Sequence, residues 1–120
     1  MCIDIHLLSG AQTIGIECIE ERLIFAQKMT HFLKLNTHCK YIKNDFFEMP
    51  LPKVSHVYIT CTCFSSETLT KLTQKLNSIE PGTIIITVTR ALSVKNVELC
   101  KSFNATFDWG RDMIFIYRKI

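Results

Sequence analysis

Short runs of β-branched and apolar residues alternate with helical stripes along this 120-residue chain, and this order limits its fold more than any other feature. The clearest runs are QTIGIEC (12–18), VSHVYITC (54–61) and TIIITVT (83–89), and the last is typical of a strand buried on both faces. Helices are predicted over 19–36 and after Ser65, a good capping residue. Strands that alternate with helices predict an α/β fold with a mostly parallel sheet.

The remaining segments complete that order. A strand is predicted over 38–43, and a loop follows it because two prolines interrupt residues 49–52. Residues 91–101 are ambiguous, and a short helix is one interpretation. The last two strands, 103–109 and 112–119, predict an antiparallel hairpin that turns at Gly110-Arg111. No internal repeat or linker divides the chain, so a single domain over 1–120 is expected.

Composition narrows the functional classes. The 14 basic and 11 acidic residues give a net charge of +3, with no basic run, which argues against a nucleic-acid partner. No apolar run is long enough to cross a membrane. Six cysteines without a secretory leader favour the reduced cytoplasm over a disulfide scaffold.

In a parallel α/β sheet, ligands bind beyond the carboxyl ends of the strands, so residues at those ends are candidates for a site. Glu17 ends the first strand, where its carboxylate could accept hydrogen bonds from a ribose diol or cap the next helix. Asp45 and Phe46 follow the second strand. They could bind an adenine amino group and cover its ring, or form an Asx-turn beside a core phenylalanine.

Residues Thr60 to Phe64 follow the third strand, where substrate-facing chemistry is expected. The Cys61-x-Cys63 spacing raises a metal site or a catalytic thiol as alternatives. A zinc site requires more ligands at suitable spacing, and a reactive thiol requires a base partner that the sequence does not offer. Simple packing is the favoured interpretation of these cysteines, and no metal site is predicted.

Taken together, these segments resemble the class I, Rossmann-like S-adenosylmethionine-dependent methyltransferases over roughly residues 10–120. The run GIECIEERLIFAQK resembles the second strand and following helix of that family, and NDFF resembles its adenine-contacting turn. The runs EPGTIIIT and FDWGRDMIFIYR resemble the fifth strand and the terminal hairpin. More narrowly, residues 55–90 and the Trp109-Gly110 turn are similar to the non-SET histone-lysine methyltransferases of the disruptor-of-telomeric-silencing type.

The resemblance implies S-adenosylmethionine as cofactor and roles for particular residues. Glu17 would hold the ribose, Cys18 would lie beside the adenine, Asp45 would bind the adenine amino group and Phe46 would stack near it. The methyl-transfer site would be lined by residues after the third strand, in particular Thr60, Cys61 and Phe64. The narrower resemblance implies a protein lysine as the methyl acceptor.

One family motif is absent. The Gly-rich D-x-G-x-G-x-G turn stands nowhere in the chain, and Gly10 and Gly15 are not spaced for it. Residues 1–9 resemble the tail of the helix that follows this motif, so the first strand of the sheet is expected to be missing; the alternating residues 2–7 could instead form a substitute strand. A shortened reading frame and a degenerate protein are both open explanations.

Two functions therefore compete. The first is a methyltransferase domain whose cofactor site is incomplete in this chain. The second is a non-catalytic module with the same fold that acts by binding a partner. A sheet without its central strand exposes unpaired edges, which predicts a partner chain or a homo-oligomer.

Overall fold

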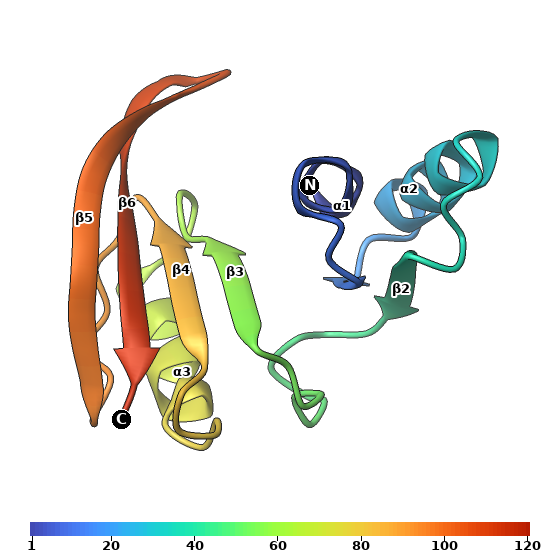
Figure 1. The fold of residues 1–120 in the computed structure, drawn as a ribbon. Coiled ribbons are helices and arrows are strands. Elements are labelled where there is room, and N and C mark those ends of the chain that lie inside the picture. Colours follow the sequence, from blue (N-terminus) through green and yellow to red (C-terminus); the bar gives the residue numbers. More distant parts are fainter. The chain divides into compact units, whose positions relative to one another are not determined.

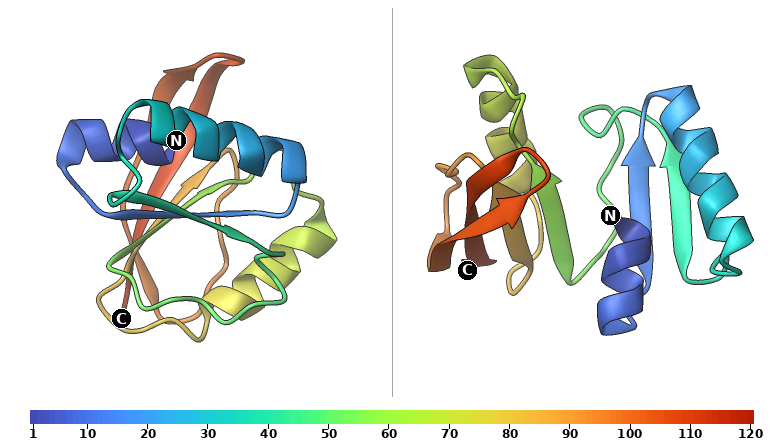
Figure 2. Two further views of the ribbon diagram at one scale, coloured as in Figure 1. Left: turned by 90° about the vertical axis from the view of Figure 1, so that its right-hand side faces the viewer. Right: turned by 90° about the horizontal axis from the view of Figure 1, so that it is seen from above.

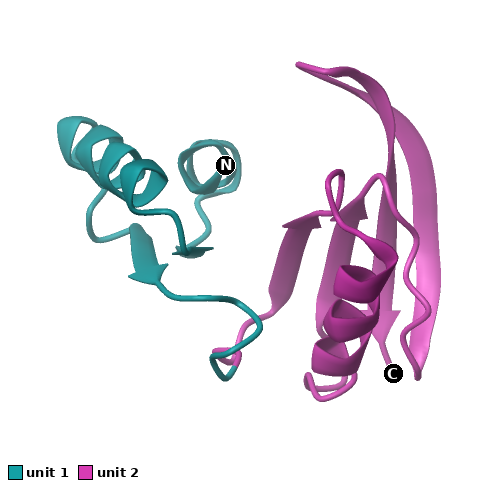
Figure 3. Ribbon diagram, turned by 180° about the vertical axis from the view of Figure 1, so that it is seen from behind, with its two compact units in different colours: residues 1–50 teal, residues 51–120 magenta.

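The structure, a computed structural model, describes residues 1–120 and divides into two compact units (Figure 3). Unit 1 is Met1–Pro50 and unit 2 is Leu51–Ile120. The single domain expected over 1–120 remains a prediction.

Unit 1 contains two helices and a two-stranded parallel sheet (Figure 1). Its elements are α1 (Cys2–Ser9), β1 (Thr13–Glu17), α2 (Glu20–Phe32) and β2 (Cys39–Lys43). Both helices lie over the same face of the sheet (Figure 2, left). The N-terminal residues are helical, as the resemblance implied, so the substitute strand over residues 2–7 is wrong.

In unit 1, the backbone of β1 packs closely against side chains from β2 and α1. Gly15 lies in β1 against the ring of Tyr41, and a Cβ at this position would stand 2.8 Å from Tyr41 Cδ1 and 3.0 Å from Cys2 Sγ. Thr30 of α2 donates its hydroxyl to Tyr41 Oη at 3.0 Å. Only a residue without a side chain lets α1 and β2 come this near to β1.

Unit 2 contains a four-stranded mixed sheet and one helix. Its elements are β3 (His56–Thr60), α3 (Ser66–Leu76), β4 (Ile84–Val88), β5 (Val97–Phe107) and β6 (Gly110–Lys119). The strand order is β3-β4-β6-β5, with β3 and β4 parallel and the other pairs antiparallel. Ser65 caps α3, because its Oγ accepts the backbone N–H of Thr68 at 3.1 Å.

The last strand pair is longer than the sequence pattern indicated. No helix forms in residues 91–101, and β5 begins at Val97 because this residue and Leu99 pair with β6. A bulge between Leu99 and Lys101 interrupts the register, which hid the strand's alternation. Because β4 pairs with β6 only over residues 114–118, the far part of the hairpin has no third strand beside it.

The core of unit 2 lies between α3 and one face of the sheet. Leu72 and Leu76 of α3 are fully buried, as is Ile85 of β4, and Tyr117 of β6 is nearly so. Ile84 and Ile86, which point to the other face, are only half-buried, whereas Val88, two residues further along the same face, is fully buried. The expected burial on both faces is therefore met within unit 2 only at the end of β4, where Thr87 and Val88 are both fully buried.

The fold class agrees with the sequence. The fold is α/β, with parallel strand pairs and a C-terminal antiparallel hairpin. The parallel strands fall into two separate sheets, and β1 and β3 each pair on one side only. This is the pattern expected of a Rossmann-like sheet that lacks its first strand. None of the helices is both long and apolar enough to span a lipid bilayer.

Candidate functional site

The carboxyl ends of β1 and β2 bring two predicted binding residues to one edge of unit 1. Glu17 pairs in register with Lys43, and the backbone N–H of Asn44 donates to the Glu17 carbonyl at 3.3 Å. Asp45 is the next residue along the chain. The two predicted carboxylates therefore follow adjacent parallel strands at the same end, where α/β sheets bind ligands.

Glu17 combines the two roles that its position allowed. Its Oε1 accepts the backbone N–H of Ile19 at 3.1 Å, at the start of α2. The second carboxylate oxygen makes no hydrogen bond within the chain, so it can accept one from a ligand. Cys18, which follows directly, is exposed with a free thiol.

Asp45 likewise uses one oxygen locally. Its Oδ1 accepts the backbone N–H of Phe47 at 2.9 Å, which is an Asx-turn. Phe46 is half-buried, and its ring meets that of Phe47 edge-on, with centroids 5.5 Å apart and planes at 80°. The turn thus fixes the carboxylate of Asp45, which is exposed, beside an aromatic pair.

The loop after β3 places the other predicted residues in unit 2. Thr60 is exposed and Phe64 is half-buried, and the Phe64 carbonyl accepts a hydrogen bond from Arg90 Nη1 at 3.4 Å. Cys61 is fully buried and its backbone N–H donates to the Val88 carbonyl at 3.1 Å. Cys61 therefore packs beneath this loop and offers no surface to a ligand.

The chemistry of the cysteines follows from burial. Loss of solvent raises the pKa of Cys61 to about 11, although the nearby Arg90 guanidinium acts in the opposite direction. At neutral pH this thiol stays protonated and is a poor nucleophile. Cys63 is exposed, all six cysteines are free, and no group of three or more His, Cys, Asp or Glu residues is placed to hold a metal ion.

A polar chain that the sequence did not single out begins in the same loop. The hydroxyls of Thr62 and Thr89 are 2.9 Å apart, and Thr89 donates to Asp112 Oδ2 at 2.5 Å. The indole N–H of Trp109 donates to the same oxygen at 3.0 Å. The sequence offered one signal, since Thr89 follows a strand end, but the pairing of Asp112 with it depends on the β4–β6 register.

Thr89 has an unusual backbone. It is β-branched and yet has a φ of 77°. Such a conformation is strained for a β-branched residue, and strain of this kind is found in turns and at functional sites. Its N–H donates to the Met113 carbonyl at 2.8 Å, so β6 helps to hold it there.

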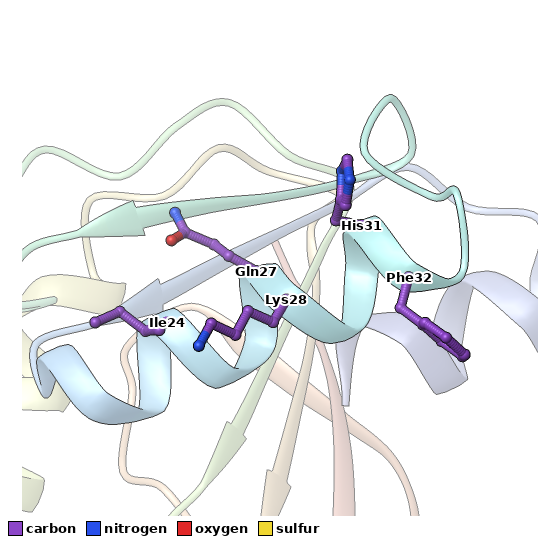
Figure 4. Close-up of a pocket in the computed structure, with 5 residues that line it drawn as sticks. All are labelled: Ile24, Gln27, Lys28, His31 and Phe32. Atoms are coloured by element: carbon purple, nitrogen blue, oxygen red, sulfur yellow. The ribbon is translucent and has the colours of Figure 1, made fainter.

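A shallow, open hollow lies elsewhere, along α2 (Figure 4). Its lining is contributed by one helix only, by Ile24, Gln27, Lys28, His31 and Phe32. None of the predicted site residues takes part in it. The hollow is therefore not connected to the strand ends that the sequence indicated.

Comparisons with known proteins support the fold rather than a close relationship. No protein-family profile matches the sequence, and no curated protein matches it either. An RNA methyltransferase from Salinibacter ruber, solved with S-adenosyl-L-homocysteine, superimposes with a TM-score of 0.80 at 16% identity over 98% of this chain and 71% of that one. The tRNA methyltransferase TrmK from B. subtilis gives 0.77 at 12% identity, over 99% and 55%.

A third solved structure is the geranyl diphosphate C-methyltransferase from Streptomyces coelicolor A3(2), with a TM-score of 0.73 at 9% identity over 98% of this chain and 67% of that one. The chain thus spans 55% to 71% of the length of these three proteins. The common fold is that of class I S-adenosylmethionine-dependent methyltransferases. Because it serves RNA and geranyl diphosphate alike, the fold does not identify an acceptor, and these structures give no support to the histone-lysine type.

Proposed function

We propose that this chain is a methyltransferase domain that uses S-adenosylmethionine, with units 1 and 2 as parts of a single Rossmann-like domain. The observation that carries the proposal is the placement of Glu17 and Asp45 at the carboxyl ends of the paired strands β1 and β2. The likeness in fold to S-adenosyl-L-homocysteine-bound methyltransferases supports it.

The residues of unit 1 fit the adenosine end of such a cofactor. The second oxygen of Glu17 can accept a hydrogen bond from a ribose hydroxyl, and the second oxygen of Asp45 can accept one from the adenine amino group. Phe46 contributes an aromatic surface beside Asp45, and Cys18 is exposed next to Glu17. Each carboxylate is already oriented by one backbone N–H, so little conformational entropy is lost on binding.

The chain offers no comparable set for the methionine end. Gly10 ends α1 with a φ of 74°, and Gly15 packs directly against the ring of Tyr41, which leaves no room there for a ligand. Neither glycine belongs to a turn whose N–H groups converge on a ligand. The proposal therefore assigns only the adenosine half of the cofactor site to this chain.

Methyl transfer demands little acid–base chemistry from the protein. The cofactor supplies a methyl group on a sulfonium, and the residues of the protein hold the acceptor in line with it. We assign this orienting role to the loop after β3, with Thr60 and Phe64 as lining residues and Cys61 as packing beneath them. A protonated, buried Cys61 cannot compete for the methyl group, which suits a transfer site.

Calorimetric titration of the 120-residue chain with S-adenosylmethionine tests the proposal. In Glu17→Gln and Asp45→Asn, the side-chain amide keeps one oxygen that can accept the local backbone N–H. The second carboxylate oxygen is replaced by an NH₂ group, which donates hydrogen bonds instead of accepting them. Each variant is expected to lower affinity by roughly tenfold or more, since a hydrogen bond to a charged group contributes roughly 1.5–3 kcal/mol.

Glu21→Gln is the matched control, since this exposed carboxylate on α2 has no partner in the chain and should bind the cofactor as the unmodified protein does. Equal affinity in all three variants would remove Glu17 and Asp45 from the site. No binding to the unmodified chain would contradict the proposal for this chain and favour the non-catalytic module.

The acceptor is a separate part of the proposal. The sequence resemblance suggests a protein lysine as acceptor, the free cysteines are compatible with a cytoplasmic setting, and the net charge of +3 offers little attraction for nucleic acid. Lysine-containing peptides and a short RNA, each offered with labelled cofactor, would separate these acceptors. The unpaired edges of β1 and β3 also support a homo-oligomer or partner chain, which light scattering would detect.

A further inference from the structure

The only tryptophan of the chain stands at the tip of the β5–β6 hairpin. Trp109 is 53% exposed, and its indole stacks on the ring of Phe107 with centroids 4.6 Å apart and planes at 8°. Because this part of the hairpin lies beyond β4, no third strand covers it. One large aromatic surface is therefore held flat and open to solvent by a second ring.

A fixed negative charge lies beside this surface. Asp112 Oδ2 accepts the indole N–H of Trp109 and the hydroxyl of Thr89, and its Oδ1 accepts the backbone N–H of Met113 at 2.8 Å. These donors lower the pKa of Asp112, most of all the Thr89 hydroxyl, so the carboxylate is ionised at neutral pH. None of the ion pairs in the chain includes Asp112.

The two features together suit a cation. An ammonium or guanidinium group is attracted to the face of an indole, and a carboxylate adds a favourable charge. The neighbouring Arg111 does not neutralise Asp112, because successive side chains of β6 point to opposite faces. Asp108, on the same turn, is a second carboxylate without an ion pair.

A nucleobase could also stack on Trp109, but its phosphate would meet the charges of Asp108 and Asp112. Charge complementarity therefore favours an organic cation. We propose that Phe107, Trp109 and Asp112 form a subsite that binds an alkylammonium or guanidinium group of the methyl acceptor. Calling the ligand the acceptor rests on the proposed function, whereas the recognition of a cation does not.

The polar chain joins this subsite to the loop proposed for methyl transfer. Asp112 is bonded to Thr89, and Thr89 lies 2.9 Å from the hydroxyl of Thr62 in the loop after β3. All of these residues belong to unit 2. A cation bound at Trp109 would thus lie along one hydrogen-bonded chain with Thr60 to Phe64, on the acceptor side of the reaction.

The fluorescence of the single tryptophan reports on the subsite without any cofactor. The full chain is titrated with n-butylammonium, n-butylguanidinium, neutral n-butylurea and adenosine 5′-monophosphate. Saturable changes in emission are expected with the two cations and not with the urea or the nucleotide. Equal responses to butylurea and butylguanidinium, or a saturable response to the nucleotide alone, would overturn the proposal.

Two variants test which carboxylate attracts the cations. Asp112→Asn should lower the affinity for both cations by about threefold to tenfold. Asp108→Asn, the same change on the same turn, should lower it by no more than about twofold. Unchanged affinity in Asp112→Asn would also overturn the proposal. Should that variant fail to fold, acrylamide quenching of the unmodified chain decides: the cations must shield Trp109 and butylurea must not.

The result is separable from that of the proposed function. Asp112→Asn is expected to leave the calorimetric affinity for S-adenosylmethionine unchanged, since Asp112 lies outside the residues assigned to adenosine. If the chain binds the cations but not S-adenosylmethionine, the cation subsite stands and the proposed methyltransferase function is rejected. If it binds S-adenosylmethionine but not the cations, the proposed function stands and the subsite is rejected.

Discussion

Unit 1 and unit 2 differ in how much apolar surface each buries by itself. Unit 2 has α3 packed on a four-stranded sheet, with Leu72, Leu76 and Ile85 fully buried. In unit 1 only Leu23 and Cys39 are buried hydrophobic residues, and large side chains are exposed on both helices, among them Leu8 at 89% and Phe32 at 79%. Unit 2 thus has a hydrophobic core of its own, whereas unit 1 buries only a few apolar side chains.

The difference has a physical cause. A two-stranded sheet covered on one face gives each helix little to pack against, whereas four strands give α3 a broad apolar surface. The candidate site divides in the same way, since the proposed cofactor carboxylates belong to unit 1 and the acceptor residues to unit 2. A ligand that binds unit 1 is therefore expected to stabilise that unit more than a ligand that binds unit 2 stabilises unit 2.

Truncation of a core leucine in each unit should give the largest contrast. Leu72→Ala is expected to reduce the free energy of unfolding by about 4 kcal/mol, and Leu23→Ala by about 2 kcal/mol, because a loosely packed site loses fewer contacts. Urea unfolding followed by circular dichroism measures both. Equal losses would show that unit 1 is as well packed as unit 2 and would break the comparison.

Alkaline pH should act on the core of unit 2 through Cys61. Its pKa is raised from 9.0 to about 11 in the folded chain, so the folded state holds this proton more tightly than the unfolded state does. The free energy of unfolding is unaffected below pH 9.0 and falls as pH rises through about 11, by about 2–3 kcal/mol.

Urea unfolding at several pH values, compared with Cys61→Ala, isolates this effect from other groups that titrate in the same range. The variant should lose that part of the pH dependence. A variant with the same alkaline slope as the unmodified chain would show that the Cys61 thiol is hydrated.

Gly15→Ala tests a tightly packed point of unit 1, where β1 meets Tyr41. The added Cβ would meet Tyr41 Cδ1 at 2.8 Å, so α1 or the tyrosine must shift. We expect a loss of about 1–3 kcal/mol. Ala26→Gly on α2 removes a methyl group instead of adding one and should cost only about 1 kcal/mol. If Gly15→Ala left the free energy of unfolding unchanged, β1 and Tyr41 would not be in close contact.

The smallest effect is expected at the cap of α3. Ser65→Ala removes the acceptor for the Thr68 N–H and should cost about 1 kcal/mol. Ser66→Ala, one residue along in the first turn, is the matched control and should be nearly neutral. Thermal unfolding of both variants measures the difference, and equal midpoints would show that α3 is held by packing alone.

Much of the fold could be predicted because it depends on local patterns. The β-branched run at 83–89, the stripe of α3 and the Ser65 cap each identified an element correctly. The start of β5 was missed, since the bulge at Leu99 and Lys101 shifts the alternation and pairing with β6 outweighs local preference. The helix at Cys2–Ser9 could be inferred only through the family resemblance.

The candidate site was predictable where strand ends define it. Glu17 and Asp45 lie one strand apart at one edge because parallel strands share a direction. Burial decided against Cys61 as a lining residue, and Asp112 was not found because its partners Thr89 and Trp109 come from different parts of the chain. Hydrogen-bonding partners of this kind depend on register, which local sequence does not specify.

The sequence by itself determined the α/β order, the hairpin and the carboxylates at the ends of β1 and β2, since side-chain periodicity and strand direction follow from local chemistry. Only the tertiary structure decided that the strands form two sheets and that Cys61 is buried. It also decided that Trp109, Asp112 and Thr89 meet at the hairpin. These features depend on contacts between segments distant in the chain, whose energies no local pattern contains.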